Sequence, residues 1–204
     1  MSMLILDPDL ERRLREEREK EYPKNHDEIW DGVYVMAALA NNEHQAFVVD
    51  LAFAFCMVVD RVAGDRVMHG FNVSDLDEDW KFNYRCPDVA VYLRTNPGTD
   101  CNTHWMEGPD LAVEITSPGE DPREKLAFYA KVNTREVLIV DRNPWKIELY
   151  QLRGGKMAFA GMSDATNPAV LPSVALPLTF QLEPGSPRPI IRIAHTASNQ
   201  TWTA

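Results

Sequence analysis

A short apolar stretch that carries one acidic residue constrains the fold of this chain more than any other part of the sequence. The stretch Leu111-Ala-Val-Glu-Ile-Thr-Ser117 lies between Pro109-Asp110 and Pro118-Gly119, so turn-forming residues bound it on both sides. Its apolar positions are dense enough for a buried strand, and it is too short for an independent helix. Glu114 lies in its middle, and an ionised carboxylate in a buried strand is costly unless a partner or a metal neutralises it. Glu114 therefore belongs either to a structural ion pair or to an active site.

Patterns elsewhere in the chain predict a mixed α/β fold. Residues 9–21 are highly charged and predict a helix or a frayed arm, whereas Asp31-Gly32 predicts the turn of a hairpin over residues 28–36. Asn41 or Asn42 can cap a long apolar helix that runs to about Asp60. A second helix begins at Asp121, and loops are expected over residues 74–80 and 94–108. Further strands are expected over residues 66–73, 86–93, 136–141, 146–152 and 156–160.

The length of 204 residues suits one domain that can bury a core without disulfides or metals. The expected organisation is a charged helical arm over residues 1–27, a domain over residues 28–180, and an irregular C-terminal tail over residues 181–204, where prolines are frequent. Strands and helices alternate along the domain, which predicts a mixed central sheet flanked by helices, with extra β-hairpins.

Charge and cysteine content exclude several classes of protein. The formal net charge of −10 opposes non-specific attraction to nucleic acid or anionic membranes, although a local basic groove or a metal could still bind phosphate. Cys56, Cys86 and Cys101 are too few and too widely spaced for a disulfide framework or a zinc site, so we expect reduced thiols and a cytoplasmic location. The N-terminus does not resemble a signal peptide, and the longest apolar run, residues 46–59, is too short to span a membrane.

Two acidic residues lie where a metal ion could use them. Asp88 follows Pro87 at the start of one predicted strand, and Glu114 lies on a later one. If those strands are neighbours, the two carboxylates converge on one divalent cation. Oxygen ligands suit Mg²⁺ or Mn²⁺. Such a site would activate water and stabilise charge on a phosphate.

Structural explanations exist for the same residues. Asp88 could simply end a strand, and Glu114 could form a buried ion pair with Lys125 or Arg123. His44, near the start of the long helix, is more typical of a structural or orienting histidine than of a metal ligand. Asp110 and Asp141 are interpreted as turn acids, and Asp121 as a helix cap.

Several blocks in register nevertheless resemble a known family. Pro87-Asp88 followed by Glu114-Ile-Thr116 is similar to the pattern of the PD-(D/E)XK nuclease superfamily. More closely, the order and spacing of blocks over about residues 28–152 resemble the Uma-two family of restriction-endonuclease-like proteins, a domain of unknown function. The blocks are Trp30-Asp-Gly-Val-Tyr-Val-Met36, Glu43-His44, Cys86-Pro-Asp-Val-Ala-Val91, Asp110-Leu-Ala-Val-Glu-Ile-Thr-Ser-Pro118, Glu124-Lys125 with Tyr129, and Glu136-Val-Leu-Ile-Val-Asp141.

The resemblance implies a restriction-endonuclease-like core and metal-dependent hydrolysis of phosphodiesters. Asp88 and Glu114 would hold Mg²⁺ or Mn²⁺, with the carbonyl of Ile115 as an extra ligand, and Glu43 would add a carboxylate or orient a water. The superfamily places a lysine two residues after the second acid, but this chain has Thr116 there. In the family the lysine lies on the following helix, so Lys125 is the candidate for stabilising the phosphate or positioning the attacking water.

The implied function is that of an endonuclease whose substrate is DNA. One alternative is a catalytically silent nuclease fold that binds nucleic acid or a protein, which the net charge and Thr116 favour. Another is a metal phosphoesterase that acts on a small substrate. A sheet edge and the apolar loop around Trp105 are the two surfaces through which a homodimer could pair.

Overall fold

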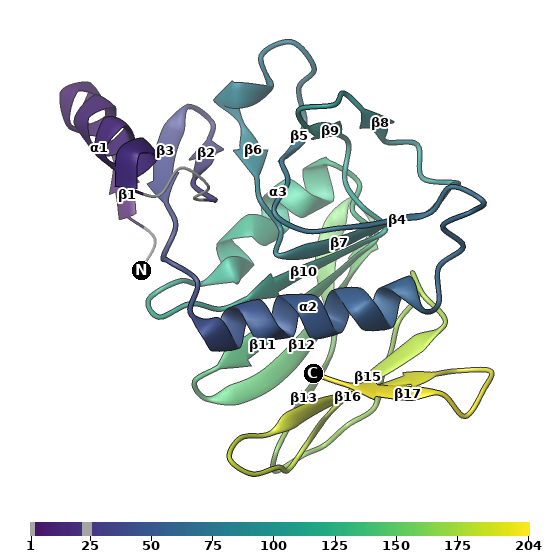
Figure 1. The fold of residues 1–204 in the computed structure, drawn as a ribbon. Helices are drawn as coiled ribbons and strands as arrows, with labels where there is room; N and C mark the ends of the chain where they lie inside the picture. The colour runs from purple at the N-terminus through teal and green to yellow at the C-terminus, as the bar shows by residue number, and fades with distance from the viewer. Residues whose placement is uncertain (1–2, 22–25) are drawn as a thin grey trace.

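A mixed six-stranded sheet forms the centre of the fold. The computed structural model describes residues 3–21 and 26–204 (Figure 1). The central sheet has the strand order β13-β12-β11-β10-β7-β4, in which β10 and β11 are parallel and the other neighbours are antiparallel. Its strands are β4 (Arg66–Met68), β7 (Val89–Tyr92), β10 (Leu111–Ile115), β11 (Glu136–Arg142), β12 (Trp145–Arg153) and β13 (Lys156–Asp164).

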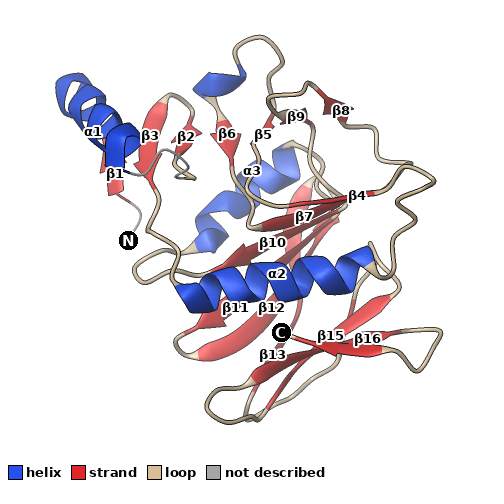
Figure 2. Ribbon diagram, in the orientation of Figure 1, coloured by secondary structure: helices blue, strands red, loops and turns tan. Residues whose placement is uncertain are grey.

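Two further sheets, of seven and four strands, flank the central sheet, and Figure 2 distinguishes strands from helices by colour. The seven-stranded sheet contains, in spatial order, β1 (Met3–Ile5), β3 (Val33–Met36), β2 (Glu28–Trp30), β6 (Tyr84–Arg85), β5 (Val73–Ser74), β9 (Trp105–Met106) and β8 (Thr99–Asp100). The four-stranded sheet contains β14 (Leu171–Pro172), β15 (Leu178–Glu183), β16 (Ile190–His195) and β17 (Thr201–Thr203). The α-helices are α1 (Pro8–Glu21), α2 (Asn42–Cys56) and α3 (Leu126–Lys131), and the 3-10 helices are η1 (Trp80–Phe82) and η2 (Pro122–Lys125).

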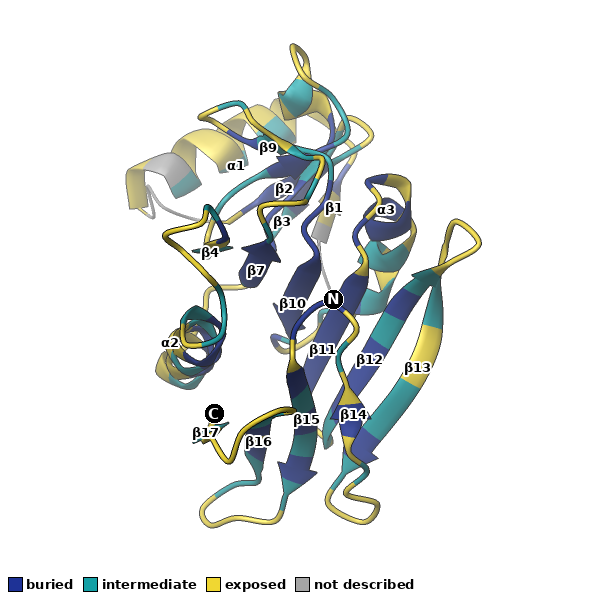
Figure 3. Ribbon diagram, turned by 90° about the vertical axis from the view of Figure 1, so that its right-hand side faces the viewer, coloured by how far each residue is buried: buried dark blue, intermediate teal, exposed yellow. Residues whose placement is uncertain are grey.

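Strand β10 is buried along its whole length (Figure 3). Alternate residues of the strand pack into different layers of the fold. Val113 and its neighbours two positions away pack with α2 and the four-stranded sheet, whereas Ala112 packs with α3 on the opposite face. Because side chains alternate along a strand, Glu114 points to the α3 face. The central sheet is therefore covered by helices on both sides, as in many α/β folds.

The capping signal for α2 is confirmed. Asn41 has an extended backbone, and its side-chain oxygen accepts a hydrogen bond of 2.9 Å from the backbone N–H of His44. The helix ends at Cys56 rather than near Asp60, because Asp60 instead organises a turn by accepting from Ala63 N at 2.9 Å. The charged segment at residues 9–21 forms α1, and Arg18 on this helix donates to Asp27 at 2.8 Å.

Several local predictions are confirmed and several are wrong. Both predicted hairpins form, and Asp31 and Gly32 have the positive φ values, 48° and 84°, that a tight hairpin turn requires. The strand predicted over residues 66–73 is instead split between β4 and β5, because Gly70 turns the chain with φ of 60°. The predicted loop over residues 94–108 contains the short strands β8 and β9, which are too brief to detect from periodicity.

The prediction of an irregular tail over residues 181–204 is wrong. Leu178, Phe180 and Leu182 alternate with more exposed residues and are fully buried, which is the pattern of a half-buried strand. The prolines that suggested irregular structure lie mostly in the turns between these strands. Residues 1–2 and 22–25 of the predicted arm lie outside the described residues. Within the described ranges, no helix has both the length and the apolar character needed to cross a membrane.

We expect Phe180→Ala to lower the free energy of unfolding by about 3–5 kcal/mol, because it opens a cavity where the four-stranded sheet meets α2. Phe180 is 0% exposed and packs edge-to-face against Phe55 with ring centroids 6.2 Å apart. Phe159→Ala is the matched control, since Phe159 is 57% exposed. Denaturant unfolding of both variants tests this, and equal stabilities would show that the C-terminal strands contribute little to the core.

Candidate active site

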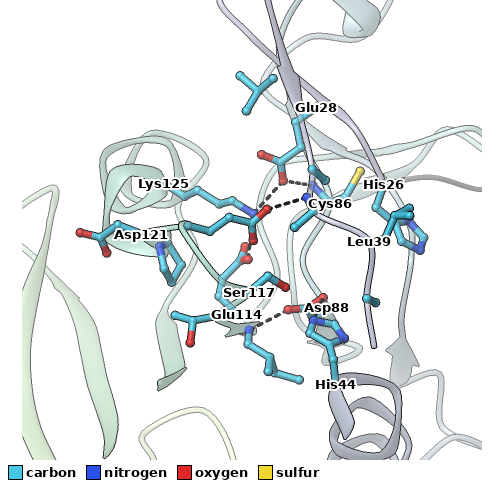
Figure 4. Close-up of a pocket in the computed structure, with 18 of the residues that line it drawn as sticks. His26, Glu28, Leu39, His44, Cys86, Asp88, Glu114, Ser117, Asp121 and Lys125 are labelled. Atoms are coloured by element: carbon cyan, nitrogen blue, oxygen red, sulfur yellow. Dashed lines mark hydrogen bonds and ion pairs between the residues drawn. The ribbon is translucent and has the colours of Figure 1, made fainter. Parts of the chain in front are cut away.

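Asp88 directly precedes β7, and β7 is the immediate neighbour of the strand that carries Glu114, as the metal-site hypothesis requires. Strands β7 and β10 pair antiparallel with Val89 opposite Val113, which brings the two acids to the same end of the ladder. The backbone N–H of Asp88 donates to the carbonyl of Val113 at 3.0 Å, and the N–H of Ile115 donates to Asp88 Oδ2 at 2.7 Å. Both carboxylates line a cavity of about 560 Å³ (Figure 4).

Lys125 reaches this cavity and binds Glu114. Asp121 caps the turn by accepting from Arg123 N at 3.1 Å, and Pro122 at its first position presets the backbone. This turn returns Lys125 to the strand, where its Nζ lies 2.8 Å from Glu114 Oε2. The hydroxyl of Tyr129 on α3 donates to the other oxygen of Glu114. The ion pair predicted as one alternative therefore exists, and it lies inside the same cavity.

The other proposed partner of Glu114, Arg123, is engaged elsewhere. It forms ion pairs with Asp141 and Glu148, the latter at 2.8 Å. Asp141 is thus a structural acid on a neighbouring strand. Thr116 donates through its hydroxyl to the carbonyl of Val140 at 3.1 Å, so it links β10 to β11 where the superfamily pattern has a lysine.

Sequence reasoning missed Glu28 as a site residue. Its Oε1 lies 2.8 Å from Lys125 Nζ and accepts from the N–H of Cys86 at 2.8 Å, while its Oε2 accepts from the indole of Trp30 at 2.7 Å. The signal was present in the hairpin, because Glu28 and Trp30 alternate with the core residue Ile29 and so share a face. Glu28 belongs to the seven-stranded sheet and becomes a neighbour of Glu114 only in the folded chain.

The start of α2 contributes His44 to the cavity, whereas Glu43 lies outside it. His44 Nε2 lies 3.1 Å from Asp88 Oδ1, and His44 Nδ1 is buried with no hydrogen-bond partner among the described residues. The carboxylate of Glu43 instead contacts Arg142 at 3.2 Å and Arg188 at 3.6 Å, and its side chain is 40% exposed. Successive residues of a helix point in different directions, so only one of the two can face Asp88. The structure therefore does not place Glu43 with the other predicted site residues.

Carboxylates outnumber cations among the groups that meet at Lys125. Burial raises the pKa of Glu114 to about 8, and the charges of Asp88 and Glu28 act in the same direction against the opposing effect of Lys125. Burial also acts to lower the pKa of Lys125, but the carboxylates of Glu114 and Glu28 outweigh it and hold the pKa above its usual value. The lysine therefore stays charged, and the surplus negative charge calls for a proton or a further cation.

The donor set at this surplus charge fits a divalent metal ion. Asp88 and Glu114 offer hard carboxylate oxygens, which are the ligands that Mg²⁺ and Mn²⁺ prefer. Each oxygen has more than one lone pair, so the hydrogen bonds described above leave acceptor capacity for a cation. Ile115 lines the same cavity, and a role for its carbonyl as an extra ligand stays a prediction.

Comparisons with known proteins support the resemblance noted in the sequence. A family model named Uma2, described as "Putative restriction endonuclease", matches residues 9–184. Among solved structures, the chain is similar to a protein of Anabaena variabilis described as a "putative nuclease belonging to DUF820". The TM-score is 0.55 at 17% sequence identity, over 72% of this chain and 80% of that one, which shows a common fold. A search of curated proteins gave no match.

We expect the metal-free protein to lose stability as the pH rises from about 4.5 to about 8. Between these values the unfolded chain releases the Glu114 proton while the folded chain retains it, so the folded state binds more protons and stability falls with pH. The loss should be on the order of a few kcal/mol, at about 1.4 kcal/mol per pKa unit. Glu114→Gln should flatten this part of the profile. Denaturant unfolding in a chelator across this range is the measurement, and an unchanged slope in the variant would contradict the pKa assignment.

Proposed function

Because this chain belongs to the Uma2 family of restriction-endonuclease-like proteins, we propose that it hydrolyses phosphodiester bonds of DNA with a divalent cation held by Asp88 and Glu114. The observation that carries the proposal is the meeting of these two carboxylates with Lys125 in one cavity. Asp88 lies just before β7, Glu114 lies on β10, and Lys125 ends the short 3-10 helix that follows β10. A structural ion pair alone would not require Asp88 beside it.

The chain's own residues supply positioning and charge. A bound Mg²⁺ or Mn²⁺ would supply Lewis acidity and neutralise charge on the phosphate. Asp88 is held in place by the N–H of Ile115 and by His44, so its carboxylate needs no rearrangement to serve as a ligand. Tyr129 fixes the orientation of Glu114 in the same way. Ligands that are already held in place lower the free-energy cost of ordering side chains when the cation binds.

Lys125 is the group that would stabilise the developing negative charge on the phosphate. Its Nζ is held between Glu114 and Glu28, each at 2.8 Å, which keeps the ammonium protonated and directed into the cavity. The Lys125 side chain is 17% exposed, and an ammonium shielded from bulk water stabilises charge more strongly than one in free solution. Lys125 therefore offers what the superfamily lysine offers, and Thr116 is free to act as a structural residue.

We expect Glu114→Ala, Asp88→Asn and Lys125→Ala each to reduce cleavage by roughly 100-fold or more, the usual scale for removing a group that stabilises the transition state. Glu43→Gln is the matched control, and it should retain cleavage because Glu43 pairs with Arg142 outside the cavity. The substrates are supercoiled plasmid, short duplexes, single strands and a small phosphodiester, each with Mg²⁺ or Mn²⁺. This panel separates a nuclease from a phosphoesterase of small molecules.

Two outcomes would overturn this function. Cleavage that survives Glu114→Ala would remove the carboxylate pair from the mechanism. Absence of cleavage of every substrate by the wild-type protein, with DNA still bound, would favour the silent nuclease fold over an enzyme. Folding of each variant is checked by thermal unfolding, so that loss of activity is not mistaken for loss of structure.

We further expect Glu28→Gln to move the alkaline limb of the pH–rate profile to lower pH. Glu28 is one of the two carboxylates that raise the pKa of Lys125. Replacing it with a neutral side chain lowers this pKa, so the ammonium loses its proton at a lower pH. The activity at neutral pH should fall less than in Lys125→Ala, because the amine remains. A profile with an unshifted alkaline limb would show that Glu28 does not act through Lys125.

A further inference from the structure

A second cluster of ligand-type side chains lies at the edge of the seven-stranded sheet, outside the cavity described above. Cys101 and His104 lie in the turn between β8 and β9, and Asp77 lies in the loop that follows β5. One ligand atom from each of the three lies within 4.8 Å of the other two. The thiol of Cys101 is 3.7 Å from Asp77 Oδ1.

The backbone of the turn brings the cysteine and the histidine together. The N–H of Cys101 donates to the carbonyl of His104 at 3.0 Å, and Asn102 turns the chain with φ of 68°. The N–H of Trp105 then donates to the carbonyl of Asn72 at 2.9 Å, which ties the end of the turn to the segment that precedes β5. The close approach of the two side chains is therefore built into a hydrogen-bonded turn.

His104 is oriented as metal-binding histidines are. Its Nε2 lies 3.0 Å from the carbonyl of Leu76, which can only accept, so Nε2 carries the hydrogen. Nδ1 then carries the lone pair, which accepts a hydrogen bond of 3.2 Å from the hydroxyl of Thr103, and a metal ion at Nδ1 would replace that hydrogen bond. His104 is 4% exposed, and its ring is stacked on Trp80 with centroids 5.0 Å apart. A backbone carbonyl that fixes the tautomer in this way is a frequent partner of ligating histidines.

We propose that Asp77, Cys101 and His104 bind a divalent cation of the zinc class, separate from the oxygen-ligand site at Asp88 and Glu114. A thiolate, an imidazole and a carboxylate suit Zn²⁺ or Co²⁺ rather than Mg²⁺. The two anionic ligands balance the charge of the cation. The thiol proton of Cys101, directed toward Asp77, leaves to solvent as the sulfur–metal bond forms. Asp77 is exposed, so solvent can reach a remaining coordination position.

A cation bound at these three residues would cross-link a part of the fold that has few backbone hydrogen bonds between strands. Strands β5, β8 and β9 have two residues each, and β9 joins the rest of the sheet through its short parallel pairing with β5. A cation shared by Asp77 and the β8–β9 turn closes the loop after β5 onto that turn. The spacing of the cysteines along the sequence could not indicate this site, because each of its three ligands is of a different type.

Cobalt titration of the full chain tests the proposal directly, because a thiolate bound to Co²⁺ gives a charge-transfer absorption in the near ultraviolet. We expect the band in the wild-type protein and in Glu114→Gln, which spares this cluster. Cys101→Ser should abolish the band, and Cys56→Ser is the matched control that should retain it, since Cys56 lies at the end of α2. Asp77→Asn, an exposed position, should weaken Co²⁺ affinity at least about tenfold.

Zn²⁺ should also raise the melting temperature of the wild-type protein and of Cys56→Ser by more than that of Cys101→Ser, because a cation that binds the folded state stabilises it and Cys101→Ser keeps only the site at Asp88 and Glu114. A folded wild-type protein that shows no thiolate band would overturn the proposal. A band that survives Cys101→Ser but is lost in Cys86→Ser would also overturn it, since the ion would then lie in the cavity that contains Asp88.

Discussion

The ammonium of Lys125 between Glu28 and Glu114 is the interaction on which the rest of the site depends. It joins the seven-stranded sheet, through Glu28, to the central sheet, through Glu114. Both acids are nearly inaccessible, with side-chain exposures of 5%, and each would be costly to bury without the lysine. Removing the lysine would leave two buried carboxylates beside Asp88, so the same residue carries a structural and a proposed chemical role.

Each element around the cavity places a different group of the candidate site. Strand β10 delivers Glu114, its antiparallel partner β7 begins directly after Asp88 and so places Asp88 beside it, and the capped start of α2 brings His44 to Asp88. The turn that begins at Asp121 returns Lys125 to the strand it has just left. The opposite face of β10 packs Val113 against α2 and the C-terminal strands. One five-residue strand therefore anchors the core on one face and carries the site on the other.

The sequence allowed prediction of those parts of the site that lie on strong local patterns. Asp88 after Pro87, Glu114 within an apolar run, and the cap at Asp121 could each be recognised from neighbouring residues. Glu28 could not, because its partner Lys125 is 97 positions away and its strand has three residues. The family resemblance implies Glu43 as the site residue at the start of α2, whereas the structure places His44 beside Asp88, because the sequence marks the helix start without fixing which side chain faces the cavity. The C-terminal strands are hard to predict from the sequence, because prolines occur both at the ends of strands and in irregular segments.

The long separation of Glu28 and Lys125 along the chain also bears on the order of folding. The contact between Glu28 and Lys125 closes a loop of 97 positions. The chain loses conformational entropy when this loop closes, and the favourable interaction forms only after that loss. The strands that hold Glu114 and Ile139 pair within a much shorter stretch and can form earlier. The cavity is complete only after the N-terminal hairpin docks on the central sheet. Accessibility of Lys125 to amine-modifying reagents during refolding would therefore report the last step of assembly rather than the first.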